Sequence, residues 1–253
     1  MSICDLSETA IEEESGGSVD REMPLTEHLA ELRKRIIICL VCWLGGCCLC
    51  YGLAPRLLEA IRASAGEGFY FVFTSPTEAF MAFVKLSMVV SLFACLPVFI
   101  YHTVAFVCPG LTERERRWLL RLVPFALLLF AAGVLFAWFV ALPIMWRFFL
   151  GFQSESVRAL WSIGEVVGFV VGAMLLCGLI FQTPLVMIFL AALDIVNLGA
   201  LQRARRVVYF GACVASAIIT PTPDAFTAVV VAVPLIVFYE ISLLMIRMLR
   251  LGQ

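Results

Sequence analysis

The chain has 253 residues, of which 62% are hydrophobic and only 15% are charged, and its mean hydropathy is +1.02. Soluble globular domains are about half apolar and about a quarter charged, so this composition excludes an ordinary soluble protein. The formal net charge of −1 says little about partners, because acidic residues crowd residues 1–22 while arginines cluster later, between apolar runs.

The composition predicts an all-α integral membrane protein. Because a bilayer core is about 30 Å thick and takes roughly 20 apolar residues per helix, the chain has room for about six transmembrane helices. Residues 1–22 are acidic and poor in apolar side chains, which predicts a disordered tail and not a cleavable signal with a basic start. A single membrane domain is predicted over residues 23–250.

The first helix is predicted directly after the tail. Leu25, Leu29, Leu32 and Ile36 recur at helical spacing, and Thr26 is suited to the N-cap position. This pattern predicts a short amphipathic helix that lies at the membrane surface and runs into the first span.

Six apolar runs provide the predicted spans, at residues 36–54, 79–107, 119–146, 163–193, 207–220 and 226–246, and residues 55–78 are expected to form an extramembrane connection. The fifth run has about 14 residues, which extend over roughly 21 Å at 1.5 Å per residue. That length is too short for an ordinary bilayer, so we expect local thinning of the membrane or burial against neighbouring helices.

The distribution of Lys and Arg predicts the orientation of the spans. Cytoplasmic loops carry an excess of these residues. If the N-terminus is inside, the inside segments contain most of the arginines, and the outside segments contain only Arg56, Arg62, Arg147 and Arg158. Both termini are therefore predicted to be cytoplasmic.

Polar side chains within apolar spans are costly and are functional candidates for that reason, which singles out Lys85, Gln182 and Glu240. Lys85 and Glu240 have the alternative of reaching toward a membrane interface. Gln182, just before Pro184, has the alternative of a plain hydrogen bond between helices. Asp224 precedes the last span and has the alternative of capping it.

Charged residues also gather outside the spans. From charge pattern alone, Glu31 and Arg33 belong to a solvated face and a basic topology anchor. Glu113 and Glu115 stand among arginines in an inside loop, where a carboxylate either pairs locally or binds a partner's arginine in a bidentate manner.

Several chemistries are not predicted. Most of the ten cysteines lie in apolar stretches, where Cys behaves as a small hydrophobe. The only histidines, His28 and His102, lie far from any close-spaced cysteine cluster, so no metal site is expected. Neither a G-x-S-x-G motif nor a P-loop occurs, which argues against a serine hydrolase and against ATP as the energy source.

Several short blocks form a family pattern along nearly the whole chain after the tail. They are LTEHLAELRKR at residues 25–35, residues 73–80 with Lys85, and residues 105–111, 115–117, 181–184 and 220–224. In this order, together with six predicted spans and a short fifth span, they resemble the TatC family, the polytopic subunit of the twin-arginine protein translocase.

The resemblance implies a concave, glove-like helical bundle in the cytoplasmic (inner) membrane of a bacterium. Such a protein binds twin-arginine signal peptides of folded proteins and organises export driven by the proton motive force. The resemblance also implies TatA-like and TatB-like single-span partners and self-association in a multimeric receptor complex within the lipid bilayer. It implies no enzyme, no cofactor and no nucleic-acid partner.

The family's functional positions are carried over residue by residue. Glu31 and Glu115 match the cytoplasmic acids that contact the paired arginines, and Arg33 lies in the same first block. Phe106 matches an aromatic near the loop that contacts the signal peptide.

Three further positions match polar sites of the family: Lys85, Gln182 and the outside-loop acid Asp224. The family often has glutamate where this chain has Gln182. An amide cannot ionise, so the resemblance implies a hydrogen bond to a partner helix at this position and no proton-linked role.

Two functions of other classes compete with this interpretation. A small-solute secondary transporter would favour internal repeats around an ionisable site at mid-membrane, and the two halves show no convincing repeat. An intramembrane enzyme would need a buried catalytic pair, and His102 has no evident serine or acid partner in the sequence.

Overall fold

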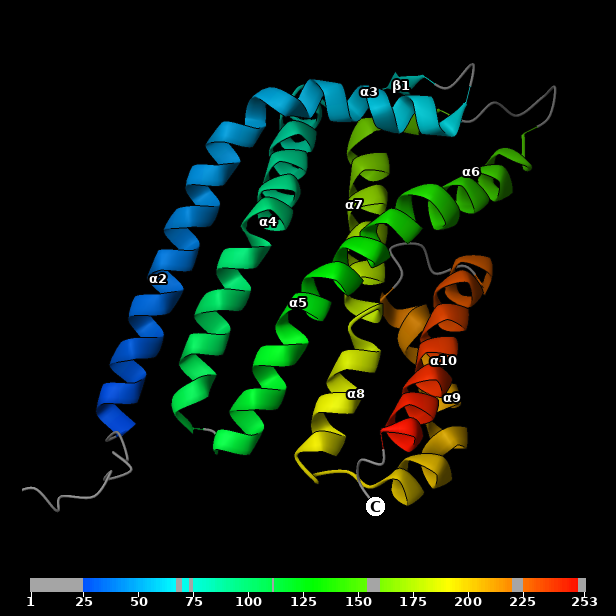
Figure 1. The fold of residues 1–253 in the computed structure, drawn as a ribbon. Coiled ribbons are helices and arrows are strands. Elements are labelled where there is room, and N and C mark those ends of the chain that lie inside the picture. Colours follow the sequence, from blue (N-terminus) through cyan, green and yellow to red (C-terminus); the bar gives the residue numbers. More distant parts are fainter. Residues whose placement is uncertain are drawn as a thin grey trace, which may run out of the picture.

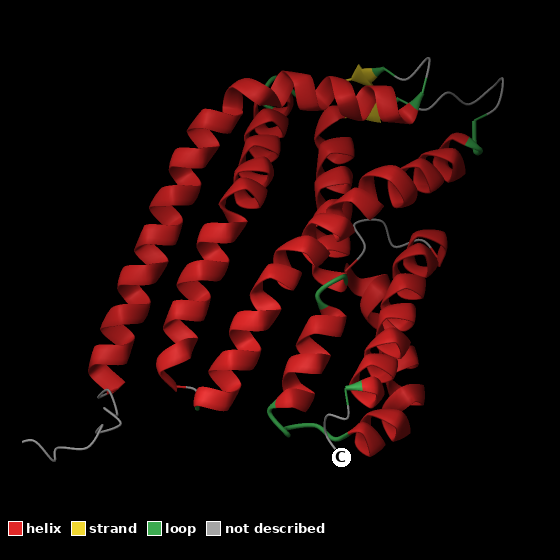
Figure 2. Cartoon of the chain, viewed as in Figure 1, coloured by secondary structure: helices red, strands yellow, loops and turns green. Residues whose placement is uncertain are grey.

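The computed structural model describes residues 25–66, 70–72, 75–110, 112–153, 160–219 and 225–249. Within them the chain is helical apart from turns and two short strands (Figure 2). The predicted tail at residues 1–22 and the predicted outside acid Asp224 lie outside the described residues.

Helices α2 (Leu25–Cys50) and α4 (Glu78–Val107) lie side by side at one edge of the bundle (Figure 1). The most extensive packing of α2 is against α4. Residues 25–50 form one continuous helix, so the expected surface-lying segment is not separate from the first span. The residues before the first predicted span therefore belong to the same helix as the span itself.

A surface element fills the predicted connection between the first two spans. After the turn Tyr51–Leu53, helix α3 (Ala54–Ala65) begins with Pro55 in its first turn, where the missing N–H of proline costs nothing. In Figure 1, α3 crosses the upper ends of the neighbouring helices, and it buries Ile61 against the core.

The strands β1 (Phe71–Val72) and β2 (Trp161–Ser162) pair in parallel above this end of the bundle. Glu78 at the start of α4 joins them to the next helix, because its carboxylate accepts hydrogen bonds from the Ser162 hydroxyl and from the Gly164 N–H, the latter at 2.9 Å. The two connections on this side of the bundle are thereby linked.

The third predicted span contains a local change of helix type. Helix α5 (Glu113–Phe136) passes through a π-helical turn (Ala137–Ala141) into α6 (Leu142–Leu150), and the element crosses the bundle obliquely (Figure 1). Pro143 has no N–H for the carbonyl one turn earlier, which accounts for a π turn at this point.

The fourth predicted span is two helices. Helix α7 (Ile163–Ile180) ends at a turn formed by Phe181 and Gln182, and α8 (Thr183–Ala192) begins with Pro184 in its first turn. The upper part of α7 lies at the centre of the bundle, where Val167 and Val170 are fully buried. Leu142, Met145 and Trp146 of α6 belong to the same core.

The last two helices form a hairpin, α9 (Leu198–Ile219) against α10 (Ala225–Met248). Among the described residues, five stretches are long and apolar enough to cross a membrane: His28–Ala65, Glu78–Gly110, Glu115–Leu150, Ile163–Ala192 and Ala225–Met248. Helix α9 is not among them, because its first half carries Arg203, Arg205 and Arg206. The all-α membrane fold is confirmed, and a sixth span at residues 207–220 stays a prediction.

The close packing of α5 on α7 depends on glycine. A Cβ added at Gly133 of α5 would lie 2.6 Å from the Cys177 carbonyl oxygen of α7. A Cβ added at Gly168 of α7 meets nothing within 4 Å. Replacing glycine by alanine at both positions therefore distinguishes an effect of helix packing, expected at Gly133, from an effect of helix propensity, expected at both.

We expect Gly133→Ala to destabilise the protein by about 1–3 kcal/mol, because the backbones of α5 and α7 have to move apart. The control Gly168→Ala should be neutral or slightly stabilising, since alanine favours helix. Thermal unfolding in detergent measures both, and equal effects of the two substitutions would contradict this packing.

Candidate functional site

Three of the sequence-predicted binding residues lie at one end of the bundle. This end, named here the α4–α5 end, is where α2 begins, α4 ends and α5 begins (Figure 1). Glu31 lies in the second turn of α2, Phe106 in the last turn of α4, and Glu115 in the first turn of α5.

Glu31 is paired with an arginine of its own helix. Arg35, one turn later, donates from Nε at 3.1 Å and from Nη2 at 2.5 Å, and both bonds go to Oε1 of Glu31. The two side chains are 27% and 21% exposed. Oε2 takes no part in this pair, so a second guanidinium can approach Glu31 without displacing Arg35. Arg33 is exposed on the same helix.

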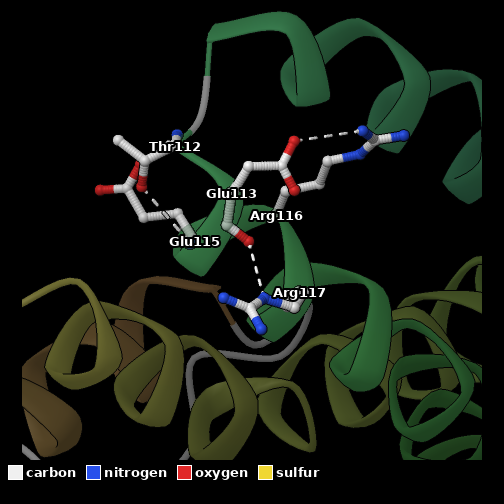
Figure 3. A network of polar contacts seen from close by, with 5 residues as sticks. All are labelled: Thr112, Glu113, Glu115, Arg116 and Arg117. Atoms are coloured by element: carbon white, nitrogen blue, oxygen red, sulfur yellow. Dashed lines mark hydrogen bonds and ion pairs between the residues drawn. The ribbon is translucent and has the colours of Figure 1, made fainter.

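Glu115 helps to cap the N-terminus of α5. Its Oε2 accepts the N–H of Thr112 at 2.8 Å, and its own N–H donates to the Thr112 hydroxyl at 3.5 Å (Figure 3). This is a capping box, which satisfies two of the free backbone donors at a helix start. Among the described side chains Glu115 pairs with no arginine, whereas the Arg114 side chain, one of its expected local partners, lies outside the described residues.

The local pairing belongs to Glu113. Its carboxylate lies 3.8 Å from Arg116, and its carbonyl accepts a 3.1 Å hydrogen bond from Arg117 (Figure 3). The Glu113 and Arg116 side chains are largely exposed, so this ion pair stabilises the helix little. Glu115 takes part in none of the ion pairs found among the described residues.

An apolar groove of about 350 Å³ runs between α2 and α4 at this end. Arg35 and Phe106 both line it, which places the Glu31–Arg35 pair at its border. The ring of Phe106 is stacked on His28 of α2, with centroids 4.3 Å apart. The structure therefore brings the Glu31–Arg35 pair and Phe106 together around one groove.

A second groove of about 560 Å³ lies on the other side of α4, toward α5. Tyr101 and Val104 line it from α4, and Arg116 and Leu120 from α5. The described hydrogen bonds of Glu115 stay within the cap of α5, so Glu31 and Glu115 are held on two separate helices. The sequence does not predict either groove, because both depend on how α2, α4 and α5 are spaced.

The other predicted polar positions lie away from this end. Lys85 is exposed two turns into α4, near the opposite end of the bundle. Gln182 lies in the α7–α8 turn, where its Nε2 donates to the Ala126 carbonyl of α5 at 3.0 Å. The alternative of a plain hydrogen bond between helices is thus the one observed for Gln182.

Glu240 is part of a contact that the sequence analysis missed. Its carboxylate accepts from Arg205 at 2.8 Å and from the Tyr209 hydroxyl, both on α9. Arg205 and Tyr209 stand one turn apart, which is the signal that they share a helix face. Their partner lies 35 residues from Arg205, a pairing that spacing within one helix cannot reveal.

The described residues contain no group of three or more His, Cys, Asp or Glu side chains able to hold a metal ion. The fold and this end of the bundle define a multi-pass helical membrane protein with acidic side chains at one end of an open helix array. The family model described as "Sec-independent protein translocase protein (TatC)" matches residues 27–234. The chain belongs to the TatC family.

Similar proteins agree with this assignment. A Sec-independent protein translocase protein TatC of Desulforapulum autotrophicum is 34% identical over 89% of this chain and 84% of its own length. A chloroplastic relative of Pisum sativum, with the same description, is 36% identical over 87% of this chain and 63% of its own length. The chain is therefore similar to bacterial and to chloroplast proteins.

Solved structures resemble the chain as well. A crystal structure titled as the twin arginine translocase receptor TatC in DDM superposes with a TM-score of 0.76 at 29% identity, over 89% of this chain and 99% of that one. A second structure with the same receptor title gives a TM-score of 0.75 at 31% identity, over 86% and 96%. These matches support the translocase and not the small-solute transporter.

The capping box at Thr112 gives a test of the local structure. We expect Thr112→Ala to destabilise the first turn of α5 by about 1 kcal/mol, because an N-cap acceptor is lost. Amide hydrogen exchange at residues 113–116 should become faster. Thr77, the N-cap residue of α4, makes no side-chain capping bond, so Thr77→Ala is the control. Equal acceleration at the starts of α4 and α5 would contradict the capping role.

Proposed function

We propose that the chain is the receptor subunit of a twin-arginine translocase and binds signal peptides through the α4–α5 end. The observation that carries the proposal is the Glu115 carboxylate, which is held by the cap of α5 and forms no ion pair among the described residues. A carboxylate in this state is ready for a bidentate bond to a guanidinium.

Glu31 contributes a second carboxylate from a different helix. Because Arg35 bonds only to Oε1, the free side of Glu31 is the one that would receive a second arginine. Two acids on two rigid helices suit a ligand with two neighbouring arginines, since planar guanidinium groups require a defined geometry. Arg33 and Phe106 complete the proposed site, with Phe106 bordering the apolar groove.

The wider function follows the family. We propose a noncatalytic role, with TatA-like and TatB-like subunits as partners, self-association in the receptor complex, and the proton motive force as the energy source. The multi-pass character is supported by the apolar helices. We place the protein in a bacterial inner membrane with both termini in the cytoplasm, as the distribution of Lys and Arg indicates.

Lys85, Gln182 and Asp224 have separate roles in this proposal. Gln182 holds α7 and α8 against α5 through its bond to Ala126 and keeps that position polar for a partner helix. Lys85 and Asp224 are proposed as polar contacts on the opposite side of the membrane.

The decisive substitution is Glu115→Gln, because glutamine preserves an acceptor for the Thr112 N–H and removes the charge. We expect binding of a synthetic twin-arginine signal peptide to the purified protein to weaken roughly tenfold or more, as for loss of a hydrogen bond between charged groups. Fluorescence anisotropy of the labelled peptide measures the affinity, and a twin-lysine peptide tests specificity.

Glu113→Gln is the matched control, because it removes the same charge two residues earlier from an exposed side chain. The affinity of the Glu113→Gln variant for the twin-arginine peptide should change little. The proposal fails if Glu113→Gln weakens binding as much as Glu115→Gln, or if Glu115→Gln binds the twin-arginine peptide as tightly as the unmodified protein.

A further inference from the structure

Two cysteines on different helices lie close together within the apolar part of the bundle. Cys42 of α2 and Cys95 of α4 have their Sγ atoms 3.8 Å apart. They are 53 positions apart in the sequence, so their proximity arises from the helix packing. A disulfide has a sulfur–sulfur distance of about 2.05 Å, so the two sulfur atoms, already in contact, have to move closer by less than about 2 Å.

Neighbouring contacts hold the two helices in register at this level. The Trp43 indole N–H donates to the Met88 carbonyl at 2.9 Å, and the Ser91 hydroxyl donates to the Trp43 carbonyl at 2.8 Å. One turn along α2, a Cβ added at Gly46 would lie 3.3 Å from the Cys95 sulfur. The same added Cβ would overlap the Ser91 hydroxyl, so glycine at this position lets α2 pack closely on the side chains of α4 beside the two cysteines.

The two thiols differ in access. Cys95 is 8% exposed, whereas Cys42 is exposed. An oxidant dissolved in the membrane therefore reaches Cys42 first, and Cys95 is in place to complete the reaction. Aqueous disulfides are poor oxidants here, because exchange requires a thiolate, which apolar surroundings disfavour.

We propose that Cys42 and Cys95 form an oxidisable dithiol whose disulfide locks α2 to α4. The oxidant is a membrane-soluble two-electron acceptor of the quinone or diazene class. For a diazene, the Cys42 sulfur adds to the nitrogen–nitrogen double bond, with its proton passing to the second nitrogen. The Cys95 sulfur then attacks the Cys42 sulfur, the S–S bond forms, the S–N bond breaks, and the hydrazine leaves with both protons and both electrons.

The lock acts on the helix that carries Glu31. Because α2 packs mainly on α4, a covalent bond between them fixes α2 to the helix on which its position depends. The inference does not depend on the proposed signal-peptide site, since it concerns only the attachment of α2.

The test uses the full chain with every cysteine except Cys42 and Cys95 replaced by alanine. Treatment with the diazene diamide in membranes should remove both thiols from maleimide labelling after denaturation, and dithiothreitol should restore them. The unmodified protein, digested without reduction, should give a crosslinked peptide pair containing Cys42 and Cys95. The oxidised protein should melt roughly 5 °C higher than the reduced one.

The matched control keeps Cys48 and Cys95 in place of Cys42 and Cys95, because Cys48 is also exposed on α2. Both of its thiols should stay reactive after diamide. The proposal is overturned if the Cys42–Cys95 variant keeps free thiols, if its disulfide joins two copies of the chain, or if oxidation leaves the melting temperature unchanged.

Discussion

The backbone of this protein has to satisfy its own hydrogen bonds wherever lipid surrounds it, because hydrocarbon provides no donors or acceptors. Continuous helices meet this requirement, and they make up nearly all of the described chain (Figure 2). Where a helix is interrupted inside the bundle, a proline is close by: Pro143 follows the π turn and Pro184 follows the α7–α8 turn. At the second of these turns, the Gln182 side chain donates a hydrogen bond to the Ala126 carbonyl and so joins the turn to α5.

The same constraint explains why the proposed binding residues lie near helix ends. Inside the bundle, Gln182 is committed to the Ala126 carbonyl and Ser91 to the Trp43 carbonyl. At the α4–α5 end, the first turn of a helix has free backbone N–H groups, and an acidic side chain can accept their hydrogen bonds. Glu115 uses one oxygen for its cap, which fixes the side chain and leaves its negative charge available. A rigid carboxylate recognises a guanidinium better than a mobile one, because less side-chain freedom is lost on binding.

Apolar runs and prolines predicted most of the helices to within a few residues. The run at 79–107 became α4, Glu78–Val107, and the run at 226–246 became α10, Ala225–Met248. Helix α3 was missed because its sequence, APRLLEAIRASA, mixes charged and apolar residues and lacks the length of a span. The short helix predicted to lie at the membrane surface is instead the first part of α2. Amphipathic spacing does not reveal whether a helix bends at the membrane surface or continues straight into the span.

The candidate site was predictable in its residues and not in its contacts. Family blocks identified Glu31, Glu115 and Phe106, because those matches depend on sequence order alone. The stacking of Phe106 on His28 and the pairing of Glu240 with Arg205 depend on helix packing, which no local spacing encodes. For the same reason the cysteines resemble small hydrophobes in the sequence, and only the α2–α4 packing reveals that Cys42 lies beside Cys95.

The central claim is that this chain reads paired arginines for protein export, and reporter export in cells depleted of it tests the claim most directly. A folded reporter with a twin-arginine signal is compared with the same reporter carrying twin lysines, with and without the restored chain. The account predicts that the restored chain rescues export of the arginine reporter alone. Export of either reporter at full rate without the chain, or equal rescue of both, would contradict it.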